Sequence, residues 1–515
     1  MLNSTSFKTR FLVSVVANTG RSAIAFITGL IVARGLSPSG YGDYSFLLGS
    51  FIAIRSLLEM GSSSAFYTFI SQKRRPRIFF LAYFAWLAIQ FVFSTVLLTV
   101  IMPQEMINKV WLGHSRDMVF LAFAAAFMQQ QVWLTINQIA ESMRKTVRFQ
   151  IVSIVLVIAH LVLVSLLLLS GRLSMIMLFW LIIGEYILAA IFSFRFLRQN
   201  DMESGAEDDE PFYFKVTLDD YKKYCKPLIL LAWIGFVYEF ADRWMLQRFG
   251  GAGQQGFYQI AYQFSSVSLL ATSSILNVFW KDIAEANGRG DKARVALMYH
   301  KVNRGLVMFG AILSGLLIPW TEQIVRVFLG QAYLMAVPVL MIMFLHPIFQ
   351  SMGQIGGTML LASGYTHSYT VICTLFMIIS LPLSYLAQAP PSNLLPGLGL
   401  GAMGMALKMV LLTIFSVNVM AWVIARRNNW KYNWTYQVIG ISAAVGSGFL
   451  AKWLVSFFSD VSTMTNKFML IIPFLAATAI YAVLIAGLIW MLPWLVGMNR
   501  EEIRDILKKM QVFQS

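Results

Sequence analysis

Six charged side chains lie in the middle of long apolar runs. They are Arg21, Arg55, Glu59, Glu239, Asp242 and Arg243. An ionisable side chain at the centre of a bilayer costs about 2.5–3.5 kcal/mol to insert, so such residues usually serve transport. The planar guanidinium of arginine can donate two parallel hydrogen bonds to a phosphate. The arginines therefore predict recognition of an anionic head group, and the carboxylates are candidates for binding a coupling ion, H⁺ or Na⁺.

Small polar residues accompany these charges at helical spacing. Asn18 and Arg21 share one face of the first run, and Gln259, Gln263 and Asn277 share a stripe of a later one. Because polar faces inside a membrane must meet each other or water, we expect them to line a central hydrated cavity. The predicted substrate-binding residues are Asn18, Arg21, Arg55, Arg243, Gln259, Gln263 and Asn277, and the ion-coupling candidates are Glu59, Glu239 and Asp242.

Two of these charges have a simpler alternative. Arg55 and Glu59 are spaced i,i+4 and could neutralise each other, although Arg before Glu is the weaker orientation for such a pair. Asp242 and the adjacent Arg243 could likewise form a pair at the outer end of their span that only holds helices together. A carboxylate beside an arginine is also held ionised and carries protons poorly. Glu239 is therefore the preferred ion-coupling residue. The isolated ionisable residues within the spans are interpreted as packing or snorkelling groups: His160, Glu185, His346 and Lys408.

The apolar runs place most of the chain in lipid. Of 515 residues, 58% are apolar and only 12% are charged, which is too apolar for a soluble globule. About 20 apolar residues cross a bilayer as a helix, and only helices satisfy the backbone inside each span. The fold class is therefore all-α, a polytopic membrane protein with about fourteen spans: 11–33, 44–70, 78–102, 117–140, 149–170, 173–197, 226–249, 256–280, 303–321, 334–361, 368–388, 399–425, 437–458 and 468–495.

Basic residues predict the orientation of these spans. If the N-terminus is cytoplasmic, the inner segments carry 28 Lys and Arg residues and the outer segments carry eight. This asymmetry places both termini in the cytoplasm. It also explains the net charge of +16 without nucleic acid, since basic loops lie against anionic lipids. The two cysteines and five histidines show no metal-ligand spacing, and no enzyme signature is present, so we expect neither a metal nor covalent catalysis.

The chain reads as two related halves. An acidic cytoplasmic linker at 198–225 follows an N-terminal lobe at 1–197 and precedes a C-terminal lobe at 226–425, and residues 426–515 add two spans and a basic tail. RGLSPSGYGDY (34–44) corresponds to RFGGAGQQGFY (248–258) at an offset of 214, which pairs Gly42 with Gly256. Such internal repeats are common in transporters, with the substrate site between them.

Four segments resemble a known family: IVARGLSPSGYGDYSF (31–46), ADRWMLQRFG (241–250), GFYQIAYQF (256–264) and VRVFLGQAYLMAVPVL (325–340). In this order they are similar to the Wzx-type polysaccharide flippases of the MOP (MATE-like) superfamily. The resemblance covers most of residues 7–425. It implies two pseudo-symmetric lobes around a cationic central cavity that works by alternating access.

The resemblance also implies the substrate and its surroundings. An undecaprenyl-pyrophosphate-linked oligosaccharide, an O-antigen or exopolysaccharide precursor, would move from the cytoplasmic to the outer leaflet of the bacterial inner membrane. Polysaccharide polymerase and other assembly proteins are the implied partners, together with membrane lipids. A lipid II flippase fits the same plan, and a MATE-type multidrug or cation antiporter fits less well because it needs acidic groups unopposed by arginine. A membrane glycosyltransferase or polymerase would need larger outer loops.

Overall fold

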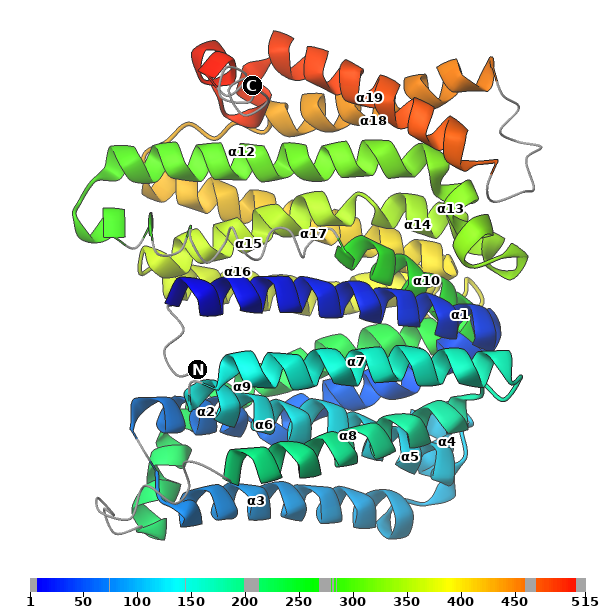
Figure 1. Cartoon of the computed structure of the whole chain (residues 1–515), viewed down its shortest axis with the longest axis vertical. Coiled ribbons are helices and arrows are strands. Elements are labelled where there is room, and N and C mark those ends of the chain that lie inside the picture. The colour runs from blue at the N-terminus through cyan, green and yellow to red at the C-terminus, as the bar shows by residue number, and fades with distance from the viewer. Residues whose placement is uncertain are drawn as a thin grey trace. The chain divides into compact units, whose positions relative to one another are not determined.

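The chain is described by a computed structural model, shown in Figure 1. The residues that it describes are 7–73, 75–143, 145–198, 213–267, 279, 282–283, 285–458 and 469–505. Within these residues all regular secondary structure is helical, and twelve helices are long and apolar enough to cross a membrane. The predicted all-α membrane fold is confirmed. Contacts divide the chain into unit 1 (Met1–Gln259 and Leu381–Gly401) and unit 2 (Ile260–Ser380 and Ala402–Ser515).

Two of the twelve helices are too long for one crossing. Helix α1 (Phe7–Glu59) has 53 residues, about 80 Å of helix, whereas the hydrocarbon layer is about 30 Å thick. It breaks at Ser37, whose φ of 64° and ψ of 169° are not helical, directly before Pro38. The second is the stretch Phe214–Val267, which contains α9 (Phe214–Met245) and α10 (Gly251–Val267). It breaks at Gly251, whose φ is 81°. Counted on either side of these breaks, the described helices give the fourteen crossings that hydropathy predicts.

Unit 1 is a bundle around an aromatic core. Its other helices are α2 (Ser62–Gln72), α3 (Arg77–Val96), α4 (Gln104–Val110), α5 (Arg116–Phe127), α6 (Trp133–Ser142), α7 (Thr146–Leu169) and α8 (Met175–Arg198). Helix α1 packs along α5, α7 and α9, so its residues contact most of the bundle. Buried rings such as Phe46, Phe66 and Phe179 fill the interior. The core therefore fixes α1, which carries Arg21 and Arg55.

The repeat found in the sequence brings two glycines into contact within unit 1. A Cβ on Gly42 would lie 1.8 Å from the carbonyl oxygen of Ala252, and a Cβ on Gly256 would lie 2.0 Å from that of Pro38. The two residues that the offset of 214 pairs thus lie at one backbone crossing of α1 and α10. Only glycine permits this approach, which is typical of close helix crossings in membranes.

Replacing Gly256 with Ala is expected to destabilise this crossing by about 1–3 kcal/mol, because the new methyl group would overlap a backbone oxygen that cannot rotate away. A Cβ on Gly253 in the same helix would have nothing within 4 Å, so Gly253→Ala is the matched control. The control should be neutral or stabilising, since alanine favours helix over glycine. Thermal unfolding in detergent tests this, and equal melting temperatures for the two variants would contradict the crossing.

Unit 2 is a second helical bundle that includes the last two spans. It contains the end of α10 with α12 (Lys292–Leu317), α13 (Thr321–Phe328), α14 (Val337–Met343), α15 (His346–Ala362), most of α16 (Thr366–Gln388), α17 (Gly401–Arg427), α18 (Thr435–Ser456) and α19 (Ile471–Met491). Helices α12 and α18 run side by side (Figure 1), with Gly448 directly against the carbonyl of Gly315. Spans thirteen and fourteen are thus integral to this unit's core. The predicted division into lobes at 198–225 stays a prediction, and residues 199–212 of the linker lie outside the described residues.

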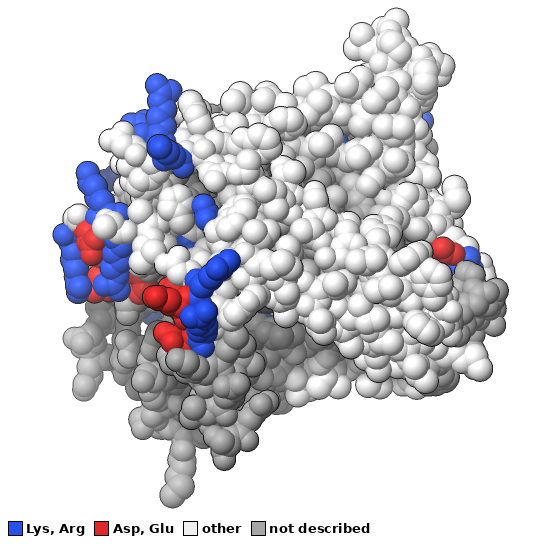
Figure 2. Space-filling view, turned by 90° about the horizontal axis from the view of Figure 1, so that it is seen from above, with Lys and Arg blue, Asp and Glu red and all other residues white. Residues whose placement is uncertain are grey.

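The basic residues of unit 2 gather at one end of its helices. Lys301, in the first half of α12, lies 2.8 Å from Glu502 of the tail, and the ring of His300 contacts that of Trp430, just beyond α17. Figure 2 shows Lys and Arg concentrated at one end of the face drawn, with Asp and Glu among them. Most of the remaining face carries uncharged side chains. This is the charge asymmetry on which the orientation prediction depends.

Candidate functional site

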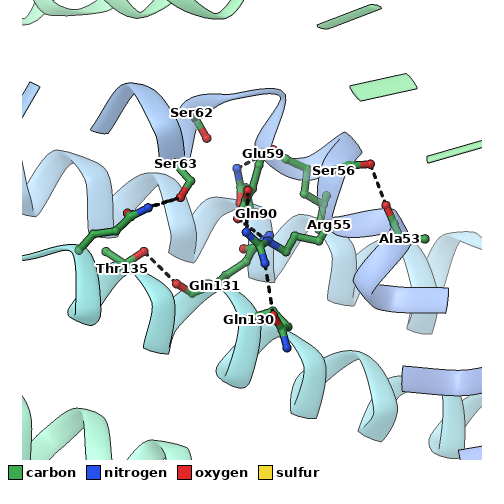
Figure 3. A network of polar contacts seen from close by, with 12 residues as sticks. Ala53, Arg55, Ser56, Glu59, Ser62, Ser63, Gln90, Gln130, Gln131 and Thr135 are labelled. Carbon is green, nitrogen blue, oxygen red and sulfur yellow. Dashed lines mark hydrogen bonds and ion pairs between the residues drawn. The ribbon is translucent and has the colours of Figure 1, made fainter. Parts of the chain in front are cut away.

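Arg55 and Glu59 form a closed ion pair on α1 (Figure 3). Arg55 Nε donates to Glu59 Oε1 at 2.7 Å, and Arg55 Nη2 donates to Glu59 Oε2 at 3.3 Å. The side chains are 26% and 14% exposed. The simpler of the two sequence interpretations, in which Arg55 and Glu59 pair with each other, therefore describes this geometry. The reason is that a half-buried guanidinium without a carboxylate would remain largely uncompensated.

Consecutive glutamines on span four complete this network. Gln130 accepts a hydrogen bond from Arg55 Nη1 at 3.3 Å, and Gln129 donates to the hydroxyl of Tyr186 at 3.2 Å. They lie in a π-helical turn, Met128–Val132, a distortion that is frequent at functional sites. A small pocket beside Arg55 is lined by Gln130, Gln131 and apolar residues of α1 and α5. These glutamines were not predicted, although three consecutive amides in mid-span were a readable signal.

Arg243 on α9 lies across the backbone of α1. Its Nη1 donates to the carbonyl of Gly49 at 3.0 Å, and its ion pair is with Glu239, at 3.8 Å. A Cβ on Gly49 would lie 2.6 Å from Arg243 Nε, so a larger residue there would have to displace the Arg243 side chain. Arg243 therefore joins α9 to α1 through an arginine–backbone contact.

The acidic residues of α9 are placed differently from the prediction. Asp242 accepts a hydrogen bond from the hydroxyl of Ser384 near the end of α16, while Glu239 forms an ion pair with Arg243. The preference for Glu239 as the ion-coupling residue stays a prediction, and the structure adds that Glu239 itself lies 3.8 Å from Arg243.

Arg21 differs from the other two arginines in its surroundings. Its guanidinium donates a hydrogen bond to the neutral amide of Asn18, and the carboxylate of Glu141 acts on it electrostatically. Arg21 is half-buried near the middle of the first half of α1, and Asn18 and Thr19 are exposed. Exposed polar residues at mid-span face water rather than acyl chains. This stretch of α1 thus presents exposed polar side chains and one guanidinium on the surface of unit 1.

The predicted glutamine stripe is only partly described. Gln259 is half-buried at the end of unit 1, and Gln263 is half-buried in unit 2. Asn277 lies outside the described residues. In unit 1 the structure therefore brings together Arg55 with Glu59, and Arg243 with Glu239. Arg21 and Asn18 lie in the N-terminal half of α1.

An apolar groove opens on unit 2, with a volume of about 570 Å³. Its walls come from α15, α17 and α18 and include Phe349, Phe415 and Val438. At one end, Gln437 Nε2 donates to Asn418 Oδ1 at 3.0 Å, and the hydroxyl of Tyr432 donates to the same oxygen. The groove therefore combines a long apolar wall with a polar end, a shape that suits an amphiphile.

A histidine and a glutamate that were predicted to be isolated form a pair in which the glutamate is buried and the histidine is partly buried. His160 Nδ1 of α7 lies 2.7 Å from Glu185 Oε2 of α8. Both residues lie near the middle of adjacent spans joined by a short turn. That placement was the available signal, because antiparallel neighbours bring mid-span positions together.

The comparisons agree with this fold. A family model described as polysaccharide biosynthesis protein matches residues 8–280, more than half of the chain. No curated protein sequence is similar enough to this chain to count as a relative. Among solved structures, the lipid II flippase MurJ in an inward closed conformation is similar with a TM-score of 0.67 at 14% identity, covering 93% of this chain and 99% of that chain.

Two further solved structures share the fold at lower similarity. An inward-facing multidrug resistance MATE family transporter of the MOP superfamily has a TM-score of 0.55 at 12% identity, covering 83% of this chain and 96% of that one. A MOP superfamily transporter from Pyrococcus furiosus has a TM-score of 0.53 at 12% identity, covering 82% and 95%. At these identities the likeness concerns the fold alone, which is the MOP superfamily fold predicted from the sequence motifs.

Proposed function

This chain belongs to the polysaccharide biosynthesis protein family, and from that premise we propose that it is a flippase for a lipid-linked oligosaccharide. The substrate is an undecaprenyl-pyrophosphate-linked repeat unit of an O-antigen or exopolysaccharide. It moves from the cytoplasmic to the outer leaflet by alternating access, coupled to H⁺ or Na⁺. No covalent chemistry is part of the proposal.

The observation that carries the proposal is the exposed polar stretch of α1 around Arg21. A guanidinium with a neutral hydrogen-bond partner, accessible at mid-span, can still donate two parallel hydrogen bonds to a phosphate oxygen pair. We assign Arg55 instead to holding α1 against α5 and the π-helical turn Met128–Val132, because its Nε and Nη2 already donate hydrogen bonds to Glu59. Arg21 with Asn18 is therefore the proposed head-group site.

The groove on unit 2 supports the lipid part of the substrate. A polyprenyl tail is too apolar to cross a hydrated passage, so it must remain against lipid or an apolar wall while the head group moves. The groove of α15, α17 and α18 supplies such a wall, with the amides of Asn418 and Gln437 at one end. We assign it to the tail.

The proposed location follows from charge. The basic end of unit 2 would lie in the cytoplasm, with both chain termini, and the protein would be a multi-pass protein of the bacterial inner membrane. A polymerase that consumes the repeat unit at the outer leaflet is the expected partner.

A second candidate is a lipid II flippase. The similarity of the fold to a lipid II flippase, at a TM-score of 0.67, favours it, and both substrates carry a pyrophosphate and a polyprenyl tail. The two functions differ in the sugar head group and in their consequence for the cell.

Gene deletion separates the candidates. For the proposed function, deletion abolishes surface polysaccharide, leaves growth and peptidoglycan intact, and an undecaprenyl-linked repeat unit accumulates at the inner leaflet. For the second candidate, lipid II accumulates and cells lyse. Normal surface polysaccharide with no accumulated intermediate would contradict both.

A further inference from the structure

The pair His160–Glu185 lies at the centre of the membrane span within unit 1. His160 is nine residues before the end of α7, about 14 Å, and Glu185 is ten residues after the start of α8, about 15 Å. Their side chains are 23% and 8% exposed. A pair of titratable groups at this depth is costly and calls for a functional reason.

One oxygen of the pair has no partner. Glu185 Oε2 is bonded to His160 Nδ1, whereas Glu185 Oε1 is buried and lacks a hydrogen-bond partner within the described part of the chain. An ionised carboxylate only accepts hydrogen bonds, so Nδ1 carries the hydrogen and Nε2 remains free to bind a proton. The pair thus has one nitrogen that can accept a proton, and the His160 side chain that carries it is 23% exposed.

A line of buried polar atoms leads away from this pair. Ser153 lies seven residues before His160 on α7, and Ser193 lies eight residues after Glu185 on α8. Because the two helices are antiparallel, both serines lie about two turns from the pair in the same direction, with Gln150 one turn beyond. Their hydroxyls and the Gln150 oxygen are buried and have no partners among the described residues. Buried polar atoms of this kind are usually bridged by ordered water.

The other charged and titratable groups around the pair are few. Tyr44 of α1 and Tyr186 of α8 interact electrostatically with Glu185, and Arg21 interacts with Tyr186. Helix α6 carries Glu141 near its end, and the charges of α5, Arg116 and Asp117, lie in its first turn. With neutral tyrosines, no cation contacts the pair directly among the described residues, so a proton can neutralise it.

We propose that His160 and Glu185 form the proton-binding site that couples transport to the proton gradient. Imidazole and carboxylate together carry a charge of −1, and one proton bound at Nε2 converts them to a neutral imidazolium–carboxylate pair. The proton leaves through water along Ser193, Ser153 and Gln150 toward the end of α7 that is predicted to be cytoplasmic. The proton-binding step stands on the contacts of unit 1, and the coupling step rests on the proposed function.

Proton binding is tested on the purified full-length protein in nanodiscs, without substrate. Infrared difference spectra between about pH 8 and about pH 5 should show imidazole protonation together with a shift of the carboxylate bands. Both signals should disappear in His160→Gln and in Glu185→Gln alike, because the groups titrate as one pair. His367→Gln, at an exposed histidine of α16, is the matched control and should remove only an isolated imidazole signal. A carboxylate signal unchanged in His160→Gln would overturn the proposal.

Coupling is tested in proteoliposomes that contain an undecaprenyl-pyrophosphate-linked oligosaccharide. With one proton exchanged per substrate and no membrane potential, a gradient of one pH unit should sustain about a tenfold ratio between the leaflets. Glu185→Gln should reduce this ratio to one while still equilibrating the substrate. A tenfold ratio in the variant would overturn the proposed site and leave the flippase standing. No movement by the wild-type protein would refute the proposed function, whereas the spectra would still report proton binding.

Discussion

Replacing Glu59 with Gln is expected to lower the free energy of unfolding by about 2–3 kcal/mol, somewhat less than the about 3–5 kcal/mol typical of breaking a fully buried ion pair. The change removes the charge that holds both Arg55 Nε and Nη2 and leaves Gln130 as a weak partner. The lower range applies because Arg55 is 26% exposed and water screens it in part. Chemical unfolding in detergent, followed by tryptophan fluorescence, measures the loss.

Two further variants make this result interpretable. Glu322→Gln breaks an ion pair with Arg326 that has the same i,i+4 spacing, but whose side chains are 43% (Arg326) and 52% (Glu322) exposed. It should lower the free energy of unfolding by less than about 1 kcal/mol. The double variant of Arg55→Gln with Glu59→Gln should recover most of the stability, because no unpaired charge remains. It should also keep surface polysaccharide. A stable double variant that exports no polysaccharide would show that Arg55 takes part in substrate binding.

Replacing Arg21 with Ala is expected to abolish surface polysaccharide while the protein level stays normal. Removing one partner of a desolvated charge contact typically costs about 2–5 kcal/mol, roughly thirtyfold or more in binding. The fold should tolerate the change, because the hydrogen bond of Arg21 goes to exposed Asn18 rather than into the core. Quantifying polymer on intact cells, with membrane protein measured in parallel, gives the effect.

The control for Arg21 is Arg172→Ala, the same chemical change at an exposed residue in the turn between α7 and α8. It should export normally. Arg21→Lys should recover part of the export, because lysine retains the positive charge but cannot donate two parallel hydrogen bonds to a phosphate. Wild-type export by Arg21→Ala would remove the proposed head-group site.

Hydropathy was sufficient to predict most of the fold. Runs of about 20 apolar residues can only be helices in lipid, so the spans follow from composition and length. The equivalent glycines Gly42 and Gly256 also indicated the repeat. Their helices can approach closely because glycine has no side chain. The packing of α18 and α19 on α12 was not predictable, because an apolar helix facing lipid and one facing protein have the same sequence pattern.

The site was predicted less well, because pairing depends on which side chains meet. Sequence spacing allowed Arg55 either to pair with Glu59 or to stay open, and only the structure shows the bidentate contact. Arg243 could not be assigned to Gly49 or Glu239 from spacing alone. His160 and Glu185 were dismissed separately, because each was considered on its own helix rather than across the hairpin.

The most direct test is reconstitution of the purified protein in liposomes with an undecaprenyl-pyrophosphate-linked oligosaccharide in one leaflet. Enzymatic access to the sugar from the other side reports the movement. The wild-type protein and Arg172→Ala should expose the sugar much faster than protein-free liposomes, and Arg21→Ala should not. Equal rates for the wild-type protein and empty liposomes, or for Arg21→Ala and the wild type, would contradict a flippase that holds the pyrophosphate at Arg21.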